Sequence, residues 1–231
     1  MSWIRRLRDA PVTVALIAVN LLVFAAMVAS SHRVVAFDPR TLIEAGSSVW
    51  APNVEASHWR WLTAAFIHVG LPHIAMNMWV LAQIGGLSER ALGRGLYAAA
   101  YVVTGTCGNV LSTTMAAHRG TPLNSAGASG AIMGLIGMAA TFAWLTGQRP
   151  IARALAMNVV FVLGVGLSLS ATGVNLVDNG AHIGGLVAGA ALGAVRARVR
   201  TAPPRWLEAL LITASFLVTA FGFGRILFLP E

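Results

Sequence analysis

Long apolar runs alternate along the chain with short segments that carry charged and small polar residues. A membrane-spanning helix needs about 20 predominantly apolar residues, with a range of roughly 17–25. Seven runs approach this length, at residues 11–30, 72–88, 95–116, 127–146, 151–170, 179–195 and 206–228. The pattern therefore predicts an all-α polytopic membrane protein.

The two ends of this series differ from its middle. The first run follows an arginine-containing segment, 1–10, that resembles the start of a signal peptide. The apolar stretch exceeds the roughly 7–15 residues usual in such a peptide, so we interpret it as an uncleaved first helix. Pro203 and Pro204 set the last run apart from the preceding six.

Arginine residues are distributed unequally between the two sides of the membrane. Cytoplasmic connections are enriched in Lys and Arg. With a cytoplasmic N-terminus, eleven arginines fall in inner segments: Arg5, Arg6, Arg8, Arg90, Arg94, Arg149, Arg153, Arg196, Arg198, Arg200 and Arg205. The outer segments hold four, and one more lies near the outer end of the last run: Arg33, Arg40, Arg60 and Arg119, then Arg225. Only an odd number of spans keeps this bias, so we expect the C-terminus outside.

Composition supports a membrane protein and argues against other classes. Of the 231 residues, 57% are hydrophobic and 10% are charged, whereas soluble domains have roughly 25% charged residues. The net charge of +8 comes from arginines, but they form no basic face with interleaved aromatics, so nucleic-acid binding is not expected. Cys107 is the single cysteine, without an intramolecular disulfide partner or companion metal ligands.

Polar side chains inside membrane spans are costly and therefore point to function. His73 and Asn77, four residues apart near the start of the second run, share one helix face. Ser129 opens the fourth run, and His182 lies near the start of the sixth. The topology places these three starts on the outer side, so the groups are expected at one membrane depth, where they can form one polar pocket.

Small residues recur every four positions on the fourth and sixth runs. These rows consist of Gly130 and Gly134 on the fourth run, and of Ala181, Gly185, Gly189 and Gly193 on the sixth. Such rows let helix backbones approach closely in lipid. We therefore expect the fourth and sixth runs to be in contact, which brings Ser129 within reach of His182.

A serine beside a histidine can be a nucleophile, because the imidazole removes the hydroxyl proton. The resulting oxyanion needs preorganised donors, and the His73 ring, the Asn77 amide and the Ser129 backbone N–H are suited to this. Serine in a membrane helix often bonds only its own backbone, and small-residue rows often serve packing alone. The conjunction of these groups at one depth is what favours catalysis.

Asp178 admits two interpretations. It lies one helical turn before His182 on the same face, as the third member of a catalytic triad would. It also stands at the start of a helix, where aspartate commonly caps free N–H groups, and burying a carboxylate in lipid is costly. We expect Asp178 to be an N-cap and the catalytic pair to be a dyad of Ser129 and His182.

The order and spacing of these motifs resemble those of the rhomboid family of intramembrane serine proteases, over most of the chain. The matching motifs are Trp59-Arg60, His68-x4-His73-x3-Asn77, Glu89-Arg90-x-Leu92-Gly93, Gly127-Ala-Ser129-Gly130 and Ala181-His182-x-Gly184-Gly185. One position departs from the family pattern. Met133, four residues after the serine, replaces an aromatic side chain that often stacks on the base, which is expected to loosen the positioning of His182.

The resemblance implies a six-helix core, 11–197, after the cytoplasmic segment 1–10, with a linker and a seventh helix in 198–231. It implies a catalytic dyad of Ser129 and His182 that uses no metal or cofactor. His73 and Asn77 are expected to stabilise the oxyanion. The residues expected to support the site are Trp59, Arg60, His68, Gly127, Gly185 and Gly189.

Members of this family cleave transmembrane segments of other proteins near the outer face. The expected partners are therefore transmembrane protein substrates and the lipid bilayer, and the expected location is a bacterial-type inner membrane. Two alternatives stay open: a non-catalytic protein of the same architecture that binds membrane helices, and a small-solute transporter. A transporter usually shows inverted repeats and interrupted helices at the midplane, and the sequence shows no repeat.

Overall fold

The structure, a computed structural model, describes residues 9–52, 57–172, 177–199, 201 and 203–228. Most of the predicted N-terminal segment, with Arg5, Arg6 and Arg8, lies outside the described residues, as does Arg200.

Long helices in the described ranges coincide with all seven predicted spans. The shortest has 17 residues and the longest 26. They are α2 (Pro11–Ser31), α5 (Leu71–Leu92), α6 (Arg94–Arg119), α7 (Ser129–Leu145), α8 (Arg149–Ala171), α9 (Asn179–Arg198) and α10 (Arg205–Phe228). Short elements join them: α3 (Pro39–Glu44), β1 (Ser48–Trp50), α4 (Arg60–Thr63), the 3-10 helix η1 (Ala64–Phe66) and β2 (Leu123–Ser125).

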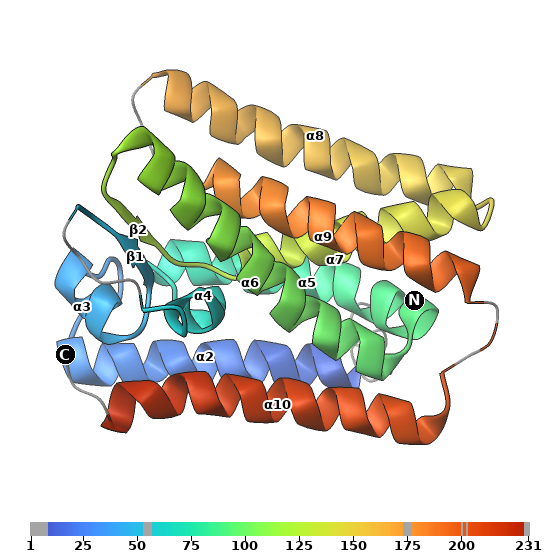
Figure 1. Cartoon of the computed structure of the whole chain (residues 1–231), viewed down its shortest axis with the longest axis horizontal. Helices are drawn as coiled ribbons and strands as arrows, with labels where there is room; N and C mark the ends of the chain where they lie inside the picture. The colour runs from blue at the N-terminus through green and yellow to red at the C-terminus, as the bar shows by residue number, and fades with distance from the viewer. Residues whose placement is uncertain (1–8, 53–56, 173–176, 200, 202, 229–231) are drawn as a thin grey trace.

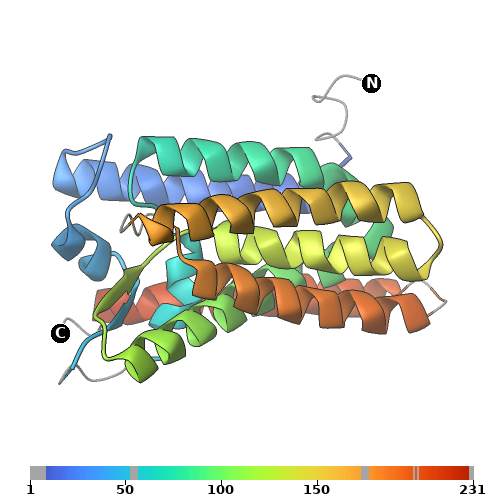
Figure 2. The same ribbon diagram turned by 90° about the horizontal axis from the view of Figure 1, so that it is seen from above.

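The long helices run side by side in a bundle, with the short elements gathered at one end (Figure 1). The start of α2 and the end of α10 lie at opposite ends of this bundle (Figure 1). Helix α7 lies in the middle, between α8 and α9 in the view of Figure 2, and most of its residues are buried. The nucleophile candidate therefore stands at the end of the central helix.

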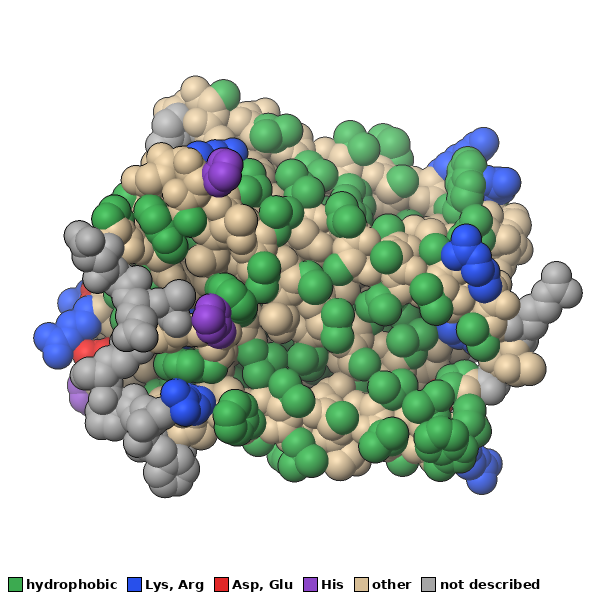
Figure 3. Space-filling view, viewed as in Figure 1, with side chains coloured by type: hydrophobic (Ala, Val, Ile, Leu, Met, Phe, Trp, Pro, Cys, Tyr) green, Lys and Arg blue, Asp and Glu red, His purple; other side chains and the backbone are tan. Residues whose placement is uncertain are grey.

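By length and composition, four helices of the described chain can each cross a membrane: α2, α8, α9 and α10. Helix α5 forms a fifth candidate with α4 and η1, which meet it at an angle of 87°. The outward-facing side chains are large and apolar, with Phe161, Phe216 and Phe221 all more than 60% exposed. Figure 3 shows hydrophobic side chains across the middle of one face and arginines toward its ends. The chain is thus a multi-pass helical membrane protein.

Helices α7 and α9 meet backbone to backbone. A Cβ added at Gly185 would collide with the Gly130 carbonyl oxygen, and one at Gly189 with the Gly134 carbonyl oxygen. Any larger residue at these two positions would force the helices apart. The predicted contact between the fourth and sixth spans is therefore confirmed.

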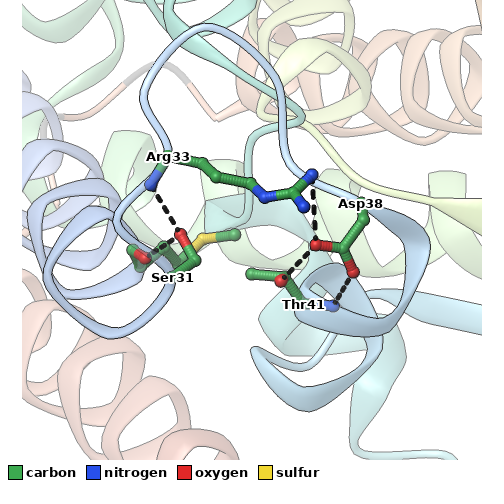
Figure 4. A network of polar contacts seen from close by, with 5 residues as sticks. Ser31, Arg33, Asp38 and Thr41 are labelled. Carbon is green, nitrogen blue, oxygen red and sulfur yellow. Dashed lines mark hydrogen bonds and ion pairs between the residues drawn. The ribbon is translucent and has the colours of Figure 1, made fainter.

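Polar contacts fix the segment between α2 and α3 (Figure 4). The Arg33 guanidinium lies 3.6 Å from the Asp38 carboxylate, which also accepts a hydrogen bond of 3.0 Å from the Thr41 backbone N–H. This bond, which caps α3, lowers the pKa of Asp38 below its usual value.

The seventh helix, α10, is an integral part of the bundle. Its first turn packs against the turn between α5 and α6, where a Cβ on Gly95 would lie 2.6 Å from the Glu208 Cα. Its other end packs on the short elements, with the Phe223 and Phe66 ring centroids 6.0 Å apart. Helix α10 therefore supports η1, the element that leads into His68 and α5.

We predict that Gly189→Ala destabilises the protein, because even one methyl group collides with the Gly134 carbonyl. The expected loss is about 1–3 kcal/mol, as for other overpacked cores, measured by thermal unfolding in detergent. Gly164→Ala on α8 is the matched control, since nothing lies within 4 Å of its Cβ, and alanine favours a helix by up to about 1 kcal/mol. Equal melting temperatures for the two variants would contradict the backbone contact.

Candidate active site

Ser129 is the first residue of α7 and is half-buried. The chain reaches it through Gly127, whose φ of +146° lies in a region that side chains disfavour. The Gly127 N–H donates a 2.9 Å hydrogen bond to the Ala64 carbonyl of η1. Because Ser129 begins the helix, its own N–H has no carbonyl in a preceding turn to bond and can serve a ligand.

Gly127 also lies between Ser129 and His73 of α5. A Cβ added there would lie 2.7 Å from His73 Cε1 and 3.6 Å from Ser129 Oγ. The His73 ring and the Ser129 hydroxyl therefore stand on the same side of Gly127, and only a glycine leaves room for both.

His182 lies in the first turn of α9 and is 4% exposed. The preceding residue, Ala181, presents its carbonyl to Gly130, next to Ser129. Within the described residues, no hydrogen bond joins His182 to Ser129. In enzymes without bound substrate, the hydrogen bond between nucleophile and base is often long or poorly aligned. The structure thus brings α5, α7 and α9 together where the sequence placed the pocket.

Asn77 and His68 surround His73. The Asn77 Nδ2 donates a 3.1 Å hydrogen bond to the His73 carbonyl, one turn earlier in α5. One amide hydrogen of Asn77 is used in this bond, and the amide has a second. The His68 ring is fully buried and meets the His73 ring edge-on, with centroids 5.3 Å apart.

Asp178 caps α9. Its Oδ1 accepts a 2.9 Å hydrogen bond from the Ala181 N–H, and its Oδ2 accepts bonds from the Ser112 and Ser125 hydroxyls at 2.6 and 2.5 Å. No bond from the His182 Nδ1 to this carboxylate is found among the described residues. This arrangement is that of an N-cap and supports a dyad over a triad.

Arg60 bonds other parts of the connection between α2 and α5. Its guanidinium lies over the Trp59 ring, 4.5 Å from the centroid. Arg60 is only 7% exposed. Its Nη1 donates hydrogen bonds to the Ile43 and Ser47 carbonyls at 2.5 and 3.4 Å. The Ile43 carbonyl belongs to α3 and the Ser47 carbonyl precedes β1, so these bonds attach α4 to the segment before it.

Sequence reasoning missed the two-stranded ribbon and the hydroxyl partners of Asp178. Strands β1 and β2 pair antiparallel, with Ser48 opposite Ser125, but three-residue strands leave too short a pattern to detect. The buried Ser112 of α6 carried a signal, as a hydroxyl in an apolar run.

Met133, the departure from the family pattern, is buried at 2% exposure. Among the described residues, no three His, Cys, Asp or Glu side chains are grouped to hold a metal ion.

A bundle of membrane helices that brings a serine and two histidines together near one end defines a multi-pass membrane protein with a candidate hydrolytic site. Residues 55–199 match the family model described as Rhomboid domain, which covers more than half of the chain. The chain therefore belongs to the rhomboid family.

The chain is similar to several curated relatives. It is 32% identical over 161 residues to Rhomboid protease GluP of Bacillus subtilis (strain 168), covering 68% of this chain and 30% of that protein. It is 33% identical to RHOMBOID-like protein 7 of Arabidopsis thaliana, covering 66% and 48% respectively. It is 29% identical to Rhomboid-like protease 2 of Toxoplasma gondii, covering 82% and 65%. The chain thus spans between about a third and two thirds of these relatives.

We predict that Arg60→Ala destabilises the connection between α2 and α5, because the Ile43 and Ser47 carbonyls lose a charged donor. Such hydrogen bonds contribute about 1.5–3 kcal/mol, which a thermal melt in detergent would detect. Arg40→Ala is the control, since Arg40 is an exposed arginine of the same connection that forms a surface ion pair with Glu44 in the next turn. Full stability with lost activity in Arg60→Ala would mean that Arg60 takes part in the chemistry instead.

Proposed function

We propose that this protein is an intramembrane serine endopeptidase, with Ser129 as nucleophile and His182 as general base. The observation that carries the proposal is the convergence of three helices on Ser129. Gly127 holds the serine beside His73 of α5, and the contact between α7 and α9 holds it beside the turn that carries His182.

The chemistry follows from these positions. His182 accepts the Ser129 hydroxyl proton while the oxygen attacks the scissile carbonyl. As the tetrahedral intermediate collapses, the imidazolium returns the proton to the departing amine, leaving an acyl-enzyme. Water then attacks the acyl-enzyme with His182 again as base, which releases the acid and restores Ser129.

The negative charge on the tetrahedral oxygen needs donors near the nucleophile. His73 lies across Gly127 from Ser129, and the Ser129 N–H lies at the start of its helix. Asn77 is one turn further along α5 and retains one amide hydrogen. We assign these three groups to the oxyanion, with His68 supporting the His73 ring from behind.

The substrates we propose are transmembrane segments of other membrane proteins. The site lies toward one end of the bundle, near the short elements (Figure 1), so a membrane-spanning substrate would be cut near one face of the bilayer. The arginine distribution makes that face the outer one, in a bacterial-type inner membrane with the N-terminus cytoplasmic and the C-terminus outside. The relatives named rhomboid proteases support the same reaction class.

The direct test is coexpression with a panel of single-span proteins that carry small residues near the outer end of the span. Wild type is expected to release a fragment whose new terminus maps to that region, and Ser129→Ala, folded and inserted in the membrane, to release none. Binding of the same proteins by both forms, with no cleavage by either, would favour the non-catalytic alternative.

We also predict that His73→Ala and Asn77→Ala each lower kcat by at least about tenfold. Loss of one oxyanion donor costs roughly 10²–10³ in other enzymes, and partial compensation between neighbouring donors reduces the effect. The measurement is the turnover of a cleaved panel member in detergent or proteoliposomes. Normal turnover by both variants would remove these residues from the proposed oxyanion site.

A further inference from the structure

Three elements of the fold meet at one carboxylate. Asp178 precedes α9 and accepts the Ala181 N–H through Oδ1. Its Oδ2 accepts one hydroxyl from Ser112 of α6, at 2.6 Å, and one from Ser125 of β2, at 2.5 Å. The three bonds join the start of α9, which carries His182, to helix α6 and to strand β2, which leads to α7.

On the strand side, this junction lies just before Ser129 in the chain. Ser125 is the last residue of β2 and stands four positions before the nucleophile. Opposite it in the ribbon is Ser48, whose hydroxyl hydrogen-bonds the Thr113 hydroxyl of α6 at 3.0 Å. The ribbon is thus attached to two adjacent residues of α6, to Thr113 directly and to Ser112 through Asp178.

The helix side of the junction fixes the start of α9. A Cβ on Gly180 would lie 2.9 Å from the Ser112 Cα, so α9 begins in close contact with α6. His182 follows within the same turn. One side chain therefore connects the segment before the nucleophile to the turn that carries the base.

We propose that Asp178 is a positioning residue for the Ser129–His182 pair and acts through hydrogen-bond geometry rather than through its charge. This inference rests on the proposed function. Without the carboxylate, no hydrogen bond found among the described residues links the β2 end to the start of α9, and each can shift relative to the other. Small displacements of reacting groups are costly, since about 1 Å of misplacement reduces rates by about 10²-fold.

Hydrogen-bond counting separates this idea from a catalytic triad. In Asp178→Asn, Oδ1 can still accept the Ala181 N–H, and the two hydrogens on Nδ2 can be donated to the Ser112 and Ser125 oxygens. All three links persist without a charge. Asp178→Ala removes all three. A triad needs the charge to stabilise the imidazolium, so it predicts that asparagine fails as alanine does.

The experiment measures the second-order rate constant for modification of Ser129 by a fluorophosphonate in detergent-solubilised protein, beside a thermal melt of each variant. We expect Asp178→Asn to react within about threefold of wild type and Asp178→Ala to react about tenfold more slowly or worse. A wild-type rate for Asp178→Ala would overturn the inference. So would an asparagine variant that is folded but as slow as the alanine variant.

A second variant keeps the test decisive if Asp178→Ala fails to fold. Ser125→Ala removes only the strand-side bond and leaves the α9 cap in place, and we expect it to react more slowly than wild type. Thr114→Ala is its control, because that exposed hydroxyl bonds only the Val110 carbonyl of its own helix. Equal rates for these two variants would overturn the inference. No reaction in wild type would overturn the proposed function, and this inference with it.

Discussion

The backbone contact between α7 and α9 is the constraint on which the rest of the structure depends. Lipid offers no hydrophobic driving force between helices, so association relies on close packing of small residues. Carbonyl oxygens of α7 face Gly185 and Gly189 of α9 with no space for a side chain. This contact places Ser129 and His182, which are distant in sequence, at the ends of two touching helices, and it sets the depth at which they meet.

A second set of interactions determines how these residues are oriented. Polar groups in an apolar environment must be paired internally, and the pairs found near the short elements each join separate elements. The Gly127 N–H bonds η1, Arg60 bonds the backbone before α4, and Asp178 bonds α6 and β2. The glycine contact brings the helices together, and these hydrogen bonds fix the loops that carry the serine and the histidines.

The seven long helices were predictable, and the candidate residues could be selected, because both depend on features that one sequence displays. Apolar length identifies spans, and a serine or histidine inside such a run is conspicuous because it is costly there. The contact of the fourth and sixth spans was also predictable, since glycines at four-residue spacing form one face. The ribbon, α3 and the attachment of α10 to η1 were not predictable. They depend on pairings between distant segments, such as Ser48 with Ser125 and Phe66 with Phe223, that leave no local periodicity.

The central claim is that Ser129 is a nucleophile activated by His182, and covalent labelling followed by peptide mapping tests it most directly. Purified protein would be treated with a fluorophosphonate at neutral pH, digested and examined by mass spectrometry. The account predicts one adduct, on the peptide that contains Ser129, formed by wild type and absent from a folded His182→Ala variant. An adduct formed equally fast without His182, or wild-type protein that cleaves substrate while Ser129 stays unmodified, would contradict it.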